Sequence, residues 1–150
     1  MTRWADIRAQ EPAFADEVEA LFRSGTNKTM ATLRADGSPR ISGTELEIGD
    51  EVTLGMMPDS RKLHDVLRDP RVAIHSPTLE PPKDPSAWVG EAKLAGRLVP
   101  IPPSEKEPPG SSSFALDVTE VVHTRVDETA TYLVVRSWHP GRGLTELKRT

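Results

Sequence analysis

Apolar residues recur at intervals of three and four near the start of the chain, which is the spacing of one helical face. They are Phe14, Val18, Leu21 and Phe22. Pro12 suits the first turn of such a helix, and Gly25 suits its C-terminal cap. The pattern therefore predicts an amphipathic N-terminal helix over about residues 11–23.

From residue 28 onward, apolar and polar residues alternate, which is the period of a strand. Asp36-Gly37 and Gly49-Asp50 interrupt the alternation with residues that are typical of tight turns. We therefore expect three strands of an antiparallel meander, at residues 28–34, 39–48 and 51–57.

The second half of the chain shows further strand patterns and is rich in proline. A short helix is expected between Pro58 and Pro70, and nine of the 14 prolines fall between Pro77 and Pro109. These prolines indicate two loops, because proline cannot donate a hydrogen bond to a sheet. The loops are expected at residues 77–87 and 100–112, and the strands at residues 71–76, 88–99, 114–122 and 131–135.

About seven strands, mostly joined by hairpins, and two helices predict a mainly β fold. Because open sheet edges promote aggregation, we expect the sheet to close fully or in part into a Greek-key-like β-barrel of six to seven antiparallel strands. One domain would span residues 1–150. Its barrel would cover about residues 28–137, and a C-terminal tail would cover residues 138–150.

Composition narrows the class of protein. The chain has 150 residues and no cysteine, which excludes disulfides, thiolate metal sites and cysteine nucleophiles. Its formal net charge is -4, and its Lys and Arg residues are dispersed, so we expect no nucleic-acid partner. No stretch approaches the roughly 18 apolar residues of a membrane span, so we expect a cytoplasmic protein with no membrane partner.

The predicted second strand carries a candidate anion-binding residue. Side chains alternate along a strand, so Arg40, Ser42 and Thr44 share the face of two apolar residues, Leu46 and Ile48. If this face is buried, Arg40 needs an anionic partner. A bulge or a frayed strand start would instead return Arg40 to solvent, and periodicity alone leaves both readings open.

The short helix carries two cations in its first turn, Arg61 and Lys62, where the helix dipole disfavours positive charge. Ser60, or alternatively Asp59, can cap this helix. A bound phosphate would offset the unfavourable placement, because Arg offers a planar fork and Lys a mobile charge. The alternative is neutralisation in solvent, at under about 1 kcal/mol per pair, by nearby carboxylates. The candidates are Asp59, Asp65 and Asp69.

The sequence lacks the common motifs of nucleotide-binding, metal-binding and catalytic sites. The chain has neither the glycine-rich loop of nucleotide hydrolases nor a dinucleotide fingerprint, and its four histidines lack metal-ligand spacing, so no metal site is predicted. No side chain is nominated as a catalytic acid, base or nucleophile. Met30, Met56 and Met57 suit either an apolar ligand or ordinary core packing.

Five motifs occur in a fixed order between residues 28 and 149. They are ATLRADGSPR (31–40), SRK (60–62), DPRVA (69–73), GEAKLAGR (90–97) and WHPGRG (138–143). The ordered set resembles the pyridoxamine 5'-phosphate oxidase-like family of FMN-binding split-barrel proteins. That resemblance implies a split barrel that forms a homodimer, with FMN bound at the subunit interface.

The resemblance also implies a set of cofactor-binding residues. The FMN phosphate would be bound by Arg40, Arg61 and Lys62, with Ser60 beside them. The backbone of the second strand would line the flavin ring, and Trp138 matches a late aromatic residue near the ring. The implied cofactor-binding residues are Arg40, Ile41, Ser42, Gly43, Thr44, Met56, Met57, Ser60, Arg61, Lys62 and Trp138, with Arg149 matched to a late arginine of the family.

The chain also departs from the family pattern. The vitamin-making oxidases have Lys and Gln where this chain has Glu45 and Glu91, and their C-terminal substrate-binding segment is missing, so oxidation of pyridoxamine phosphate is not expected. The implied function is an FMN-dependent oxidoreductase acting on a small organic substrate. Two alternatives stay open: a reductase that uses the deazaflavin coenzyme F-420, and a non-catalytic flavin- or haem-binding sensor.

Overall fold

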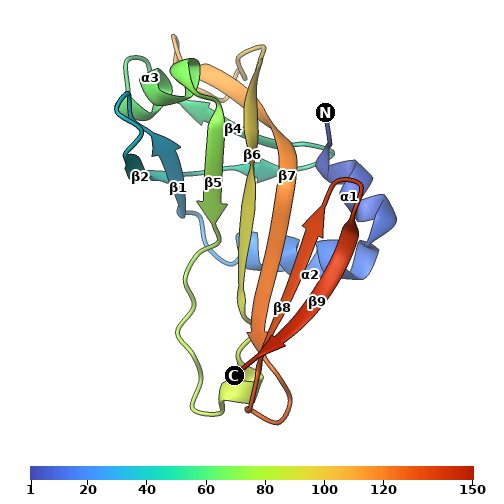
Figure 1. The fold of residues 1–150 in the computed structure, drawn as a ribbon. Helices are drawn as coiled ribbons and strands as arrows, with labels where there is room; N and C mark the ends of the chain where they lie inside the picture. The colour runs from blue at the N-terminus through green and yellow to red at the C-terminus, as the bar shows by residue number, and fades with distance from the viewer.

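The computed structural model describes residues 1–150, which fold mainly into antiparallel strands with three α-helices (Figure 1). The elements are α1 (Trp4–Gln10), α2 (Pro12–Phe22), β1 (Lys28–Leu33), β2 (Pro39–Thr44), β3 (Glu47–Ile48), β4 (Val52–Met56), α3 (Arg61–Arg68), β5 (Arg71–His75), the 3-10 turn η1 (Pro85–Ala87), β6 (Glu91–Ile101), β7 (Ser112–Val126), β8 (Leu133–His139) and β9 (Gly143–Arg149).

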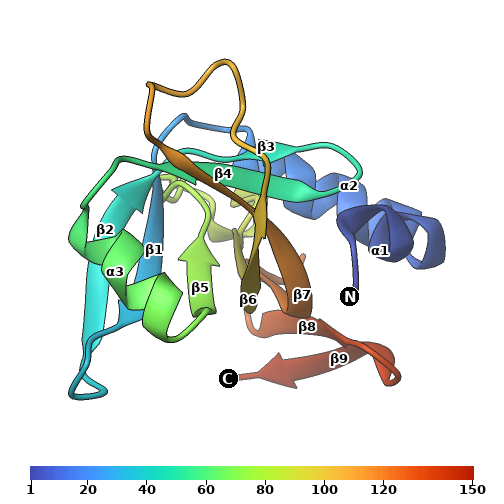
Figure 2. The same ribbon diagram turned by 90° about the horizontal axis from the view of Figure 1, so that it is seen from above.

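Seven strands form a continuous path in the order β2-β1-β5-β6-β7-β4-β3. The two outermost strands, β2 and β3, are consecutive in the chain and are separated only by Glu45 and Leu46. One segment therefore supplies both edges of the path, which forces the sheet to curve into a barrel. The view from above shows β4 and β3 crossing over the end of the curved sheet (Figure 2).

Strand β7 is long enough to belong to two parts of the sheet. Its first residues, Ser112 to Ala115, pair with β4, whereas Val121 to Val126 pair with β8. The β6–β7 ladder shifts register at Ala95 and Gly96, where a bulge increases the local twist. A side chain at Gly96 would overlap a backbone carbonyl of β7, so only glycine fits there. The sheet therefore splits, and the β8–β9 hairpin extends away from the barrel.

One hydrophobic cluster of 23 buried residues fills the molecule. Helices α1 and α2 contribute to it from the side opposite α3, as both ribbon views show (Figures 1 and 2). Buried Glu19 of α2 accepts hydrogen bonds from Trp4, Arg8 and Arg23. The two arginines also donate to backbone carbonyls of the β3–β4 turn. One carboxylate thus fixes both helices to the barrel.

The predicted mainly β split-barrel fold is confirmed. Six of the seven predicted strands supply the barrel path, whereas the seventh, expected at residues 131–135, corresponds to β8 outside that path. The predicted N-terminal helix corresponds to α2, and the predicted short helix to α3. The predicted strand over 39–48 is divided into β2 and β3, because the chain must cross from one sheet edge to the other at Glu45 and Leu46. None of the helices combines the length and the apolar character that a membrane span requires.

At each end of the chain the structure contains an element that was not predicted, helix α1 at the start and strand β9 at the end. Helix α1 was not expected, because its seven residues give only one clear apolar repeat, Trp4 and Ile7, both fully buried. The segment assigned to a C-terminal tail instead completes β8 and forms β9. Most of β9 is exposed, so its sequence does not show the alternation of apolar and polar residues that predicts a strand. The turn that leads into β9 is recognisable, because Gly141 and Gly143 adopt the positive φ angles of a tight turn.

Candidate functional site

A cationic hollow lies between α3 and the β1–β2 turn, with a volume of about 490 Å³. Four arginines line it against two carboxylates, although the whole chain carries a formal net charge of -4. We call this hollow the arginine pocket. Its lining residues are Arg34, Ala35, Asp36, Arg40, Arg61, His64, Asp65 and Arg68. Such a concentration of positive charge attracts an anion.

Buried Asp65 holds the arginine pocket together. Its carboxylate accepts hydrogen bonds from Thr32 Oγ1 at 2.7 Å, Arg40 Nε at 2.7 Å and Arg68 Nη2 at 3.1 Å. Burial raises the pKa of Asp65, but the hydrogen bonds from Arg40, Thr32 and Arg68 outweigh it and hold the pKa at about 2. Asp65 is therefore charged at neutral pH, and it anchors α3 to β1 and β2.

Arg40 points to the inner side of β2, as predicted, and only one-fifth of its side chain is exposed (20%). Its Nε is engaged by Asp65, whereas its two terminal nitrogens have no protein acceptor. The alternative in which Arg40 returns to solvent is therefore wrong. The anion that neutralises it within the chain is Asp65, and the terminal nitrogens keep donors for a second anion.

Arg61 and Arg34 have no hydrogen-bond acceptor and no ion-pair partner within the chain. None of the three candidate carboxylates neutralises Arg61. Asp59 forms no ion pair, Asp65 pairs with Arg40 and Arg68, and Asp69 pairs with Arg71. With four arginines against the carboxylates of Asp36 and Asp65, the arginine pocket retains an excess of positive charge. Asp36, whose pKa is lowered by hydrogen bonds from Ser38 and also by the charge of Arg34, offsets only part of it.

The start of α3 is docked onto β2. Ser60 caps the helix by accepting a hydrogen bond from Leu63 N at 3.3 Å, as predicted. Lys62 turns away from the arginine pocket and donates through Nζ to Gly43 O at 2.8 Å. Burial lowers the pKa of Lys62. Of the two predicted first-turn cations, Arg61 faces the arginine pocket and Lys62 faces the backbone of β2.

The other predicted residues of β2 alternate between inside and outside. Ile41 is 74% exposed, and Gly43 faces open space. Thr44 is buried, and its hydroxyl donates to the Glu45 carbonyl. The hydroxyl of Ser42 is buried without a hydrogen-bond partner. A buried hydroxyl left unpaired is costly, so Ser42 offers a polar contact to a ligand that lies along β2.

The two predicted methionines lie in different environments. Met56 is buried in the core, which agrees with ordinary packing, whereas Met57 is exposed next to the turn before α3. Trp138 is buried in the core on β8, and β1, β5, β6 and β7 lie between β8 and β2 in the sheet order. Within one chain, Trp138 is therefore not brought together with Arg40 and Arg61. Arg149 lies at the end of β9, also away from them.

Strand β2 connects the arginine pocket with a second hollow. Arg40, near its start, lines the arginine pocket, and Glu45, just after its end, lines a polar hollow of about 490 Å³. At the usual rise of a strand, five residues separate these positions by about 16 Å. An elongated ligand lying along β2 would thus contact a cationic site at one end and a polar site at the other.

Of the eight residues that line the arginine pocket, the sequence predicted only Arg40 and Arg61 as site residues. The six that it missed include His64, Asp65 and Arg68 of α3 and Arg34 of the β1–β2 turn. A signal was present, because positions 61, 64, 65 and 68 share one face of a helix. Arg34 comes to the same place through the β1–β2 turn, where Arg34 N bonds to Ser38 O. No group of three or more His, Asp and Glu side chains gathers in a metal-binding arrangement.

Comparison with solved structures identifies the fold. PhzG from Burkholderia lata 383, in complex with tetrahydrophenazine-1-carboxylic acid, aligns with a TM-score of 0.65 and 12% identity over 96% of this chain and 91% of its own. A pyridoxamine 5'-phosphate oxidase-related, FMN-binding protein from Nostoc punctiforme aligns with a TM-score of 0.65 and 13% identity, over 93% and 96% of the two chains. An F420 reductase aligns with a TM-score of 0.53 and 17% identity, over 69% of this chain and 94% of its own.

The protein therefore has the split-barrel fold of pyridoxamine 5'-phosphate oxidase-related proteins, and the resemblance noted in its sequence motifs is confirmed at the level of fold. The same fold occurs in a protein that binds FMN and in one that is an F420 reductase. No protein-family model matches the sequence, and no curated protein matches it.

Proposed function

We propose that the protein is a flavin-dependent oxidoreductase that binds FMN and acts on a small organic substrate. The observation that carries this proposal is the arginine pocket, in which Arg34 and Arg61 have no protein partner at the head of strand β2. Support also comes from the fold, which is shared with an FMN-binding protein. We further propose that the protein works in the cytoplasm as a homodimer.

The residues of the site suit a phosphate-bearing flavin. Arg61 and the terminal nitrogens of Arg40 would bind the phosphate through charge-assisted hydrogen bonds. Ser42 and the backbone around Gly43 would orient the rest of the molecule along β2, with Lys62 fixing that backbone. A bound flavin supplies two-electron transfer, whereas the protein supplies orientation and exclusion of water.

A deazaflavin is the second candidate, and one observation favours it. Arg34 lines the arginine pocket beyond the predicted phosphate ligands and has no hydrogen-bond or ion-pair partner within the chain, whereas Arg68 is bound by Asp65 and by the Leu33 carbonyl. The tail of coenzyme F-420 carries carboxylates in addition to its phosphate, and one of these would pair with Arg34. The same fold is found in an F420 reductase.

Titration of the purified protein with FMN tests the proposal directly. Quenching of flavin fluorescence should saturate at one FMN per chain, and substrate-panel turnover should exceed that of free flavin. Parallel titration with coenzyme F-420 compares the affinities for the two cofactors. Tighter binding of F-420 than of FMN would favour the deazaflavin-dependent reductase over the FMN-dependent oxidoreductase. Saturable binding without turnover would instead indicate a flavin-binding sensor. If neither cofactor binds, the proposed function is wrong.

Arg61→Ala is expected to weaken FMN binding by about 1 to 3 kcal/mol, the cost of losing a charge-assisted hydrogen bond. Folding should be unaffected, because Arg61 has no partner within the chain and is exposed. Arg142→Ala is the matched control, since Arg142 is also exposed and lies in the β8–β9 turn, outside the arginine pocket. Equal FMN affinity in both variants would refute the phosphate-binding role of Arg61.

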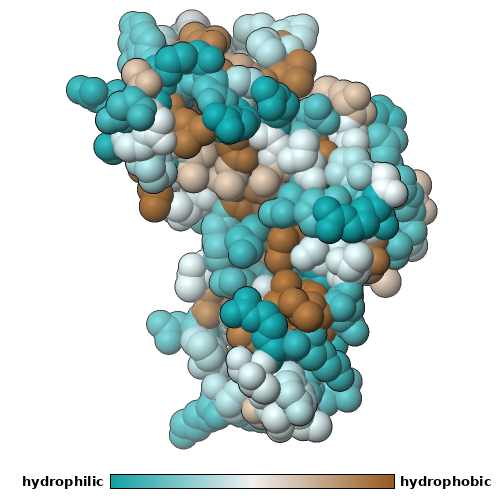
Figure 3. All heavy atoms as spheres, viewed as in Figure 1, coloured by the Kyte–Doolittle hydropathy of each residue, from teal (hydrophilic) through white to brown (hydrophobic).

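The surface of β1, β2, β5 and β6 is a candidate dimer interface. Apolar residues reach the surface over β1, β5 and β6 (Figure 3), and a shallow hollow of about 210 Å³ lies among Ala31, Ile41 and Ala73. Exposed Ile41 would gain burial worth about 1.5 to 3 kcal/mol from a second subunit.

Ile41→Glu is therefore expected to convert the dimer into a monomer at micromolar concentration, because it places a charge in the proposed interface. Sedimentation velocity measures the change, and Leu147→Glu provides a control at an exposed leucine on β9. A wild-type protein that sediments as a monomer, or a dimer that tolerates Ile41→Glu, would contradict this interface.

A further inference from the structure

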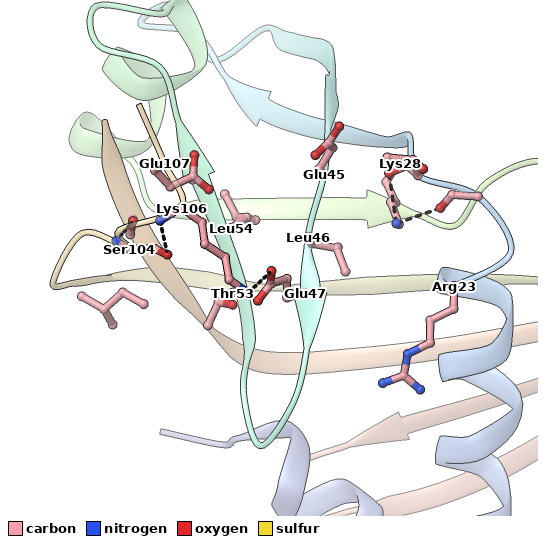
Figure 4. A pocket seen from close by; sticks show the side chains of 15 residues that line it. Arg23, Lys28, Glu45, Leu46, Glu47, Thr53, Leu54, Ser104, Lys106 and Glu107 are labelled. Carbon is pink, nitrogen blue, oxygen red and sulfur yellow. Dashed lines mark hydrogen bonds and ion pairs between the residues drawn. The ribbon is translucent and has the colours of Figure 1, made fainter. Parts of the chain in front are cut away.

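The polar hollow at the far end of β2 is a second candidate binding site, and we call it the polar pocket. Its volume of about 490 Å³ falls within the usual range for small-molecule sites. The β3–β4 hairpin, the start of β1 and the loop over residues 102–111 enclose it (Figure 4). Its apolar side chains are only Leu46, Leu54 and Ile101, so polar contacts must dominate binding.

The three cations that line the polar pocket are already engaged by the protein. Lys28 is buried and donates through Nζ to the carbonyls of Gly25 at 2.8 Å and Thr26 at 3.0 Å. Arg23 pairs with Glu19, and Lys106 pairs with Glu47 at 3.6 Å (Figure 4). Each cation of the polar pocket therefore already has a partner within the chain, a carboxylate for Arg23 and Lys106 and two backbone carbonyls for Lys28.

Two carboxylates in the polar pocket are not engaged in this way. Neither the Glu45 carboxylate nor the Glu107 carboxylate accepts a hydrogen bond from the protein, and neither forms an ion pair within 4.0 Å. Glu45 lies near enough to Lys28 to raise its pKa, although burial lowers that pKa more. Glu107 is half-buried, and the adjacent Lys106 pairs with Glu47 instead of with it. Because a partly desolvated carboxylate is stabilised by a cationic donor, the unpaired carboxylate of Glu107 favours a positively charged ligand.

The backbone of Glu107 is restrained by its surroundings, and its carboxylate lies against β4. Its loop contains Pro102, Pro103, Pro108 and Pro109, which restrict the backbone. Its backbone N–H donates to Ser104 O at 3.1 Å. Its carboxylate rests against Gly55 of β4, where a Cβ atom would lie within 2.6 Å of both carboxylate oxygens. Glycine at position 55 thus leaves the space that the carboxylate occupies.

We propose that the polar pocket binds a small molecule with a positively charged amine, and that Glu107 is its principal anionic contact. The amine would donate hydrogen bonds to Glu107, and Glu45 would add negative charge on the adjacent wall. That this amine is the substrate of the oxidoreductase rests on the proposed function, whereas the binding of an amine does not.

The test therefore uses protein without cofactor, so that failure of the amine site and failure of flavin binding are distinguished. Dissociation constants are measured at pH 7 by ligand-observed NMR for benzylamine, its neutral analogue benzyl alcohol and the anion benzoate. Benzylamine is expected to bind at least tenfold more tightly than either of the other two. Equal or tighter binding of benzoate or benzyl alcohol would overturn the proposal.

Three variants assign the effect to Glu107. Glu107→Gln keeps the shape and removes the charge, and it should reduce benzylamine affinity about fivefold to tenfold without changing the affinity for benzyl alcohol. Gly55→Ala keeps the charge but displaces the carboxylate, and it should reduce benzylamine affinity as well. Glu105→Gln makes the same charge change in the same loop outside the polar pocket, and it should have no effect. Unchanged benzylamine binding in Glu107→Gln would refute the role of Glu107.

Discussion

Replacing Asp65 by Ala should lower the free energy of unfolding by about 3 kcal/mol, as measured by urea denaturation. Breaking a buried ion pair usually costs about 3 to 5 kcal/mol, because the remaining charge loses its partner. The lower value is expected here, because Arg40 and Arg68 keep some contact with solvent. Asp65→Ala should also weaken FMN binding, since the carboxylate positions Arg40 and anchors α3.

Two controls separate the charge of Asp65 from general effects of substitution. Asp65→Asn keeps an oxygen acceptor but removes the charge, so its stability should lie between those of the wild type and Asp65→Ala. Asp16→Ala removes an exposed carboxylate from α2 and should change stability by less than about 0.5 kcal/mol. A loss below 1 kcal/mol in Asp65→Ala would show that Asp65 does not hold the arginine pocket together.

The stabilisation from Asp65 should depend on pH in a defined direction. Its pKa of about 2 in the folded protein lies below the value of about 3.9 expected for an unfolded chain. The contribution is therefore fully present above about pH 4 and is lost as the pH falls through 2. Between these limits, the stability of the wild type should fall toward that of Asp65→Asn, and a difference that stays constant down to pH 2 would contradict the lowered pKa.

Replacing Glu19 by Ala should destabilise the protein by about 2 to 4 kcal/mol. The change leaves the buried indole N–H of Trp4 without an acceptor and deprives Arg8 and Arg23 of their partner. The same arginines reach the carbonyls of Ile48 and Gly49, so α1, α2 and the β3–β4 turn should loosen together. Urea denaturation measures the loss, and hydrogen exchange would locate it in these elements.

The two variants should differ in FMN binding, which Asp65→Ala is expected to weaken and Glu19→Ala is expected to leave unchanged. Because α1 and α2 lie on the side opposite α3, folded Glu19→Ala should bind FMN with the affinity of the wild type. Glu80→Ala is a suitable control, since Glu80 is exposed in the loop before β6. If Glu19→Ala were as stable as Glu80→Ala, the carboxylate would not fix the helices to the barrel.

The sequence predicted those parts of the fold in which local pattern and burial agree. The strand predicted over residues 88–99 corresponds to β6, and Ala92, Leu94 and Leu98, which alternate with polar residues in the sequence, are all buried. Strand β9 was missed, because pairing with β8 stabilises it more than burial does. A strand held mainly by backbone hydrogen bonds leaves little pattern in its side chains.

For the candidate site, the sequence predicted two of the arginines that line the arginine pocket, but it did not predict that the Asp65 carboxylate holds the pocket together. Arg40 and Arg61 were identified by their positions on a strand and a helix, and both line the arginine pocket. Asp65 was considered only as a solvent partner for the helix cations, because sequence spacing alone did not show that α3 packs on β1. Tertiary packing decides which carboxylate pairs with which arginine, and 25 residues separate Asp65 from Arg40.

The position of β7 in the sheet also governs how the chain is assembled during synthesis. Strands β4 and β6 both pair with β7, and β4 has no other barrel partner except the two-residue β3. On the ribosome, a nascent chain that has not reached Ser112 therefore leaves the facing edges of β4 and β6 unpaired and cannot close the barrel. Because proteins are made from the N-terminus, the barrel is completed only when most of the chain has left the exit tunnel, and unpaired strand edges of this kind are prone to aggregate until then.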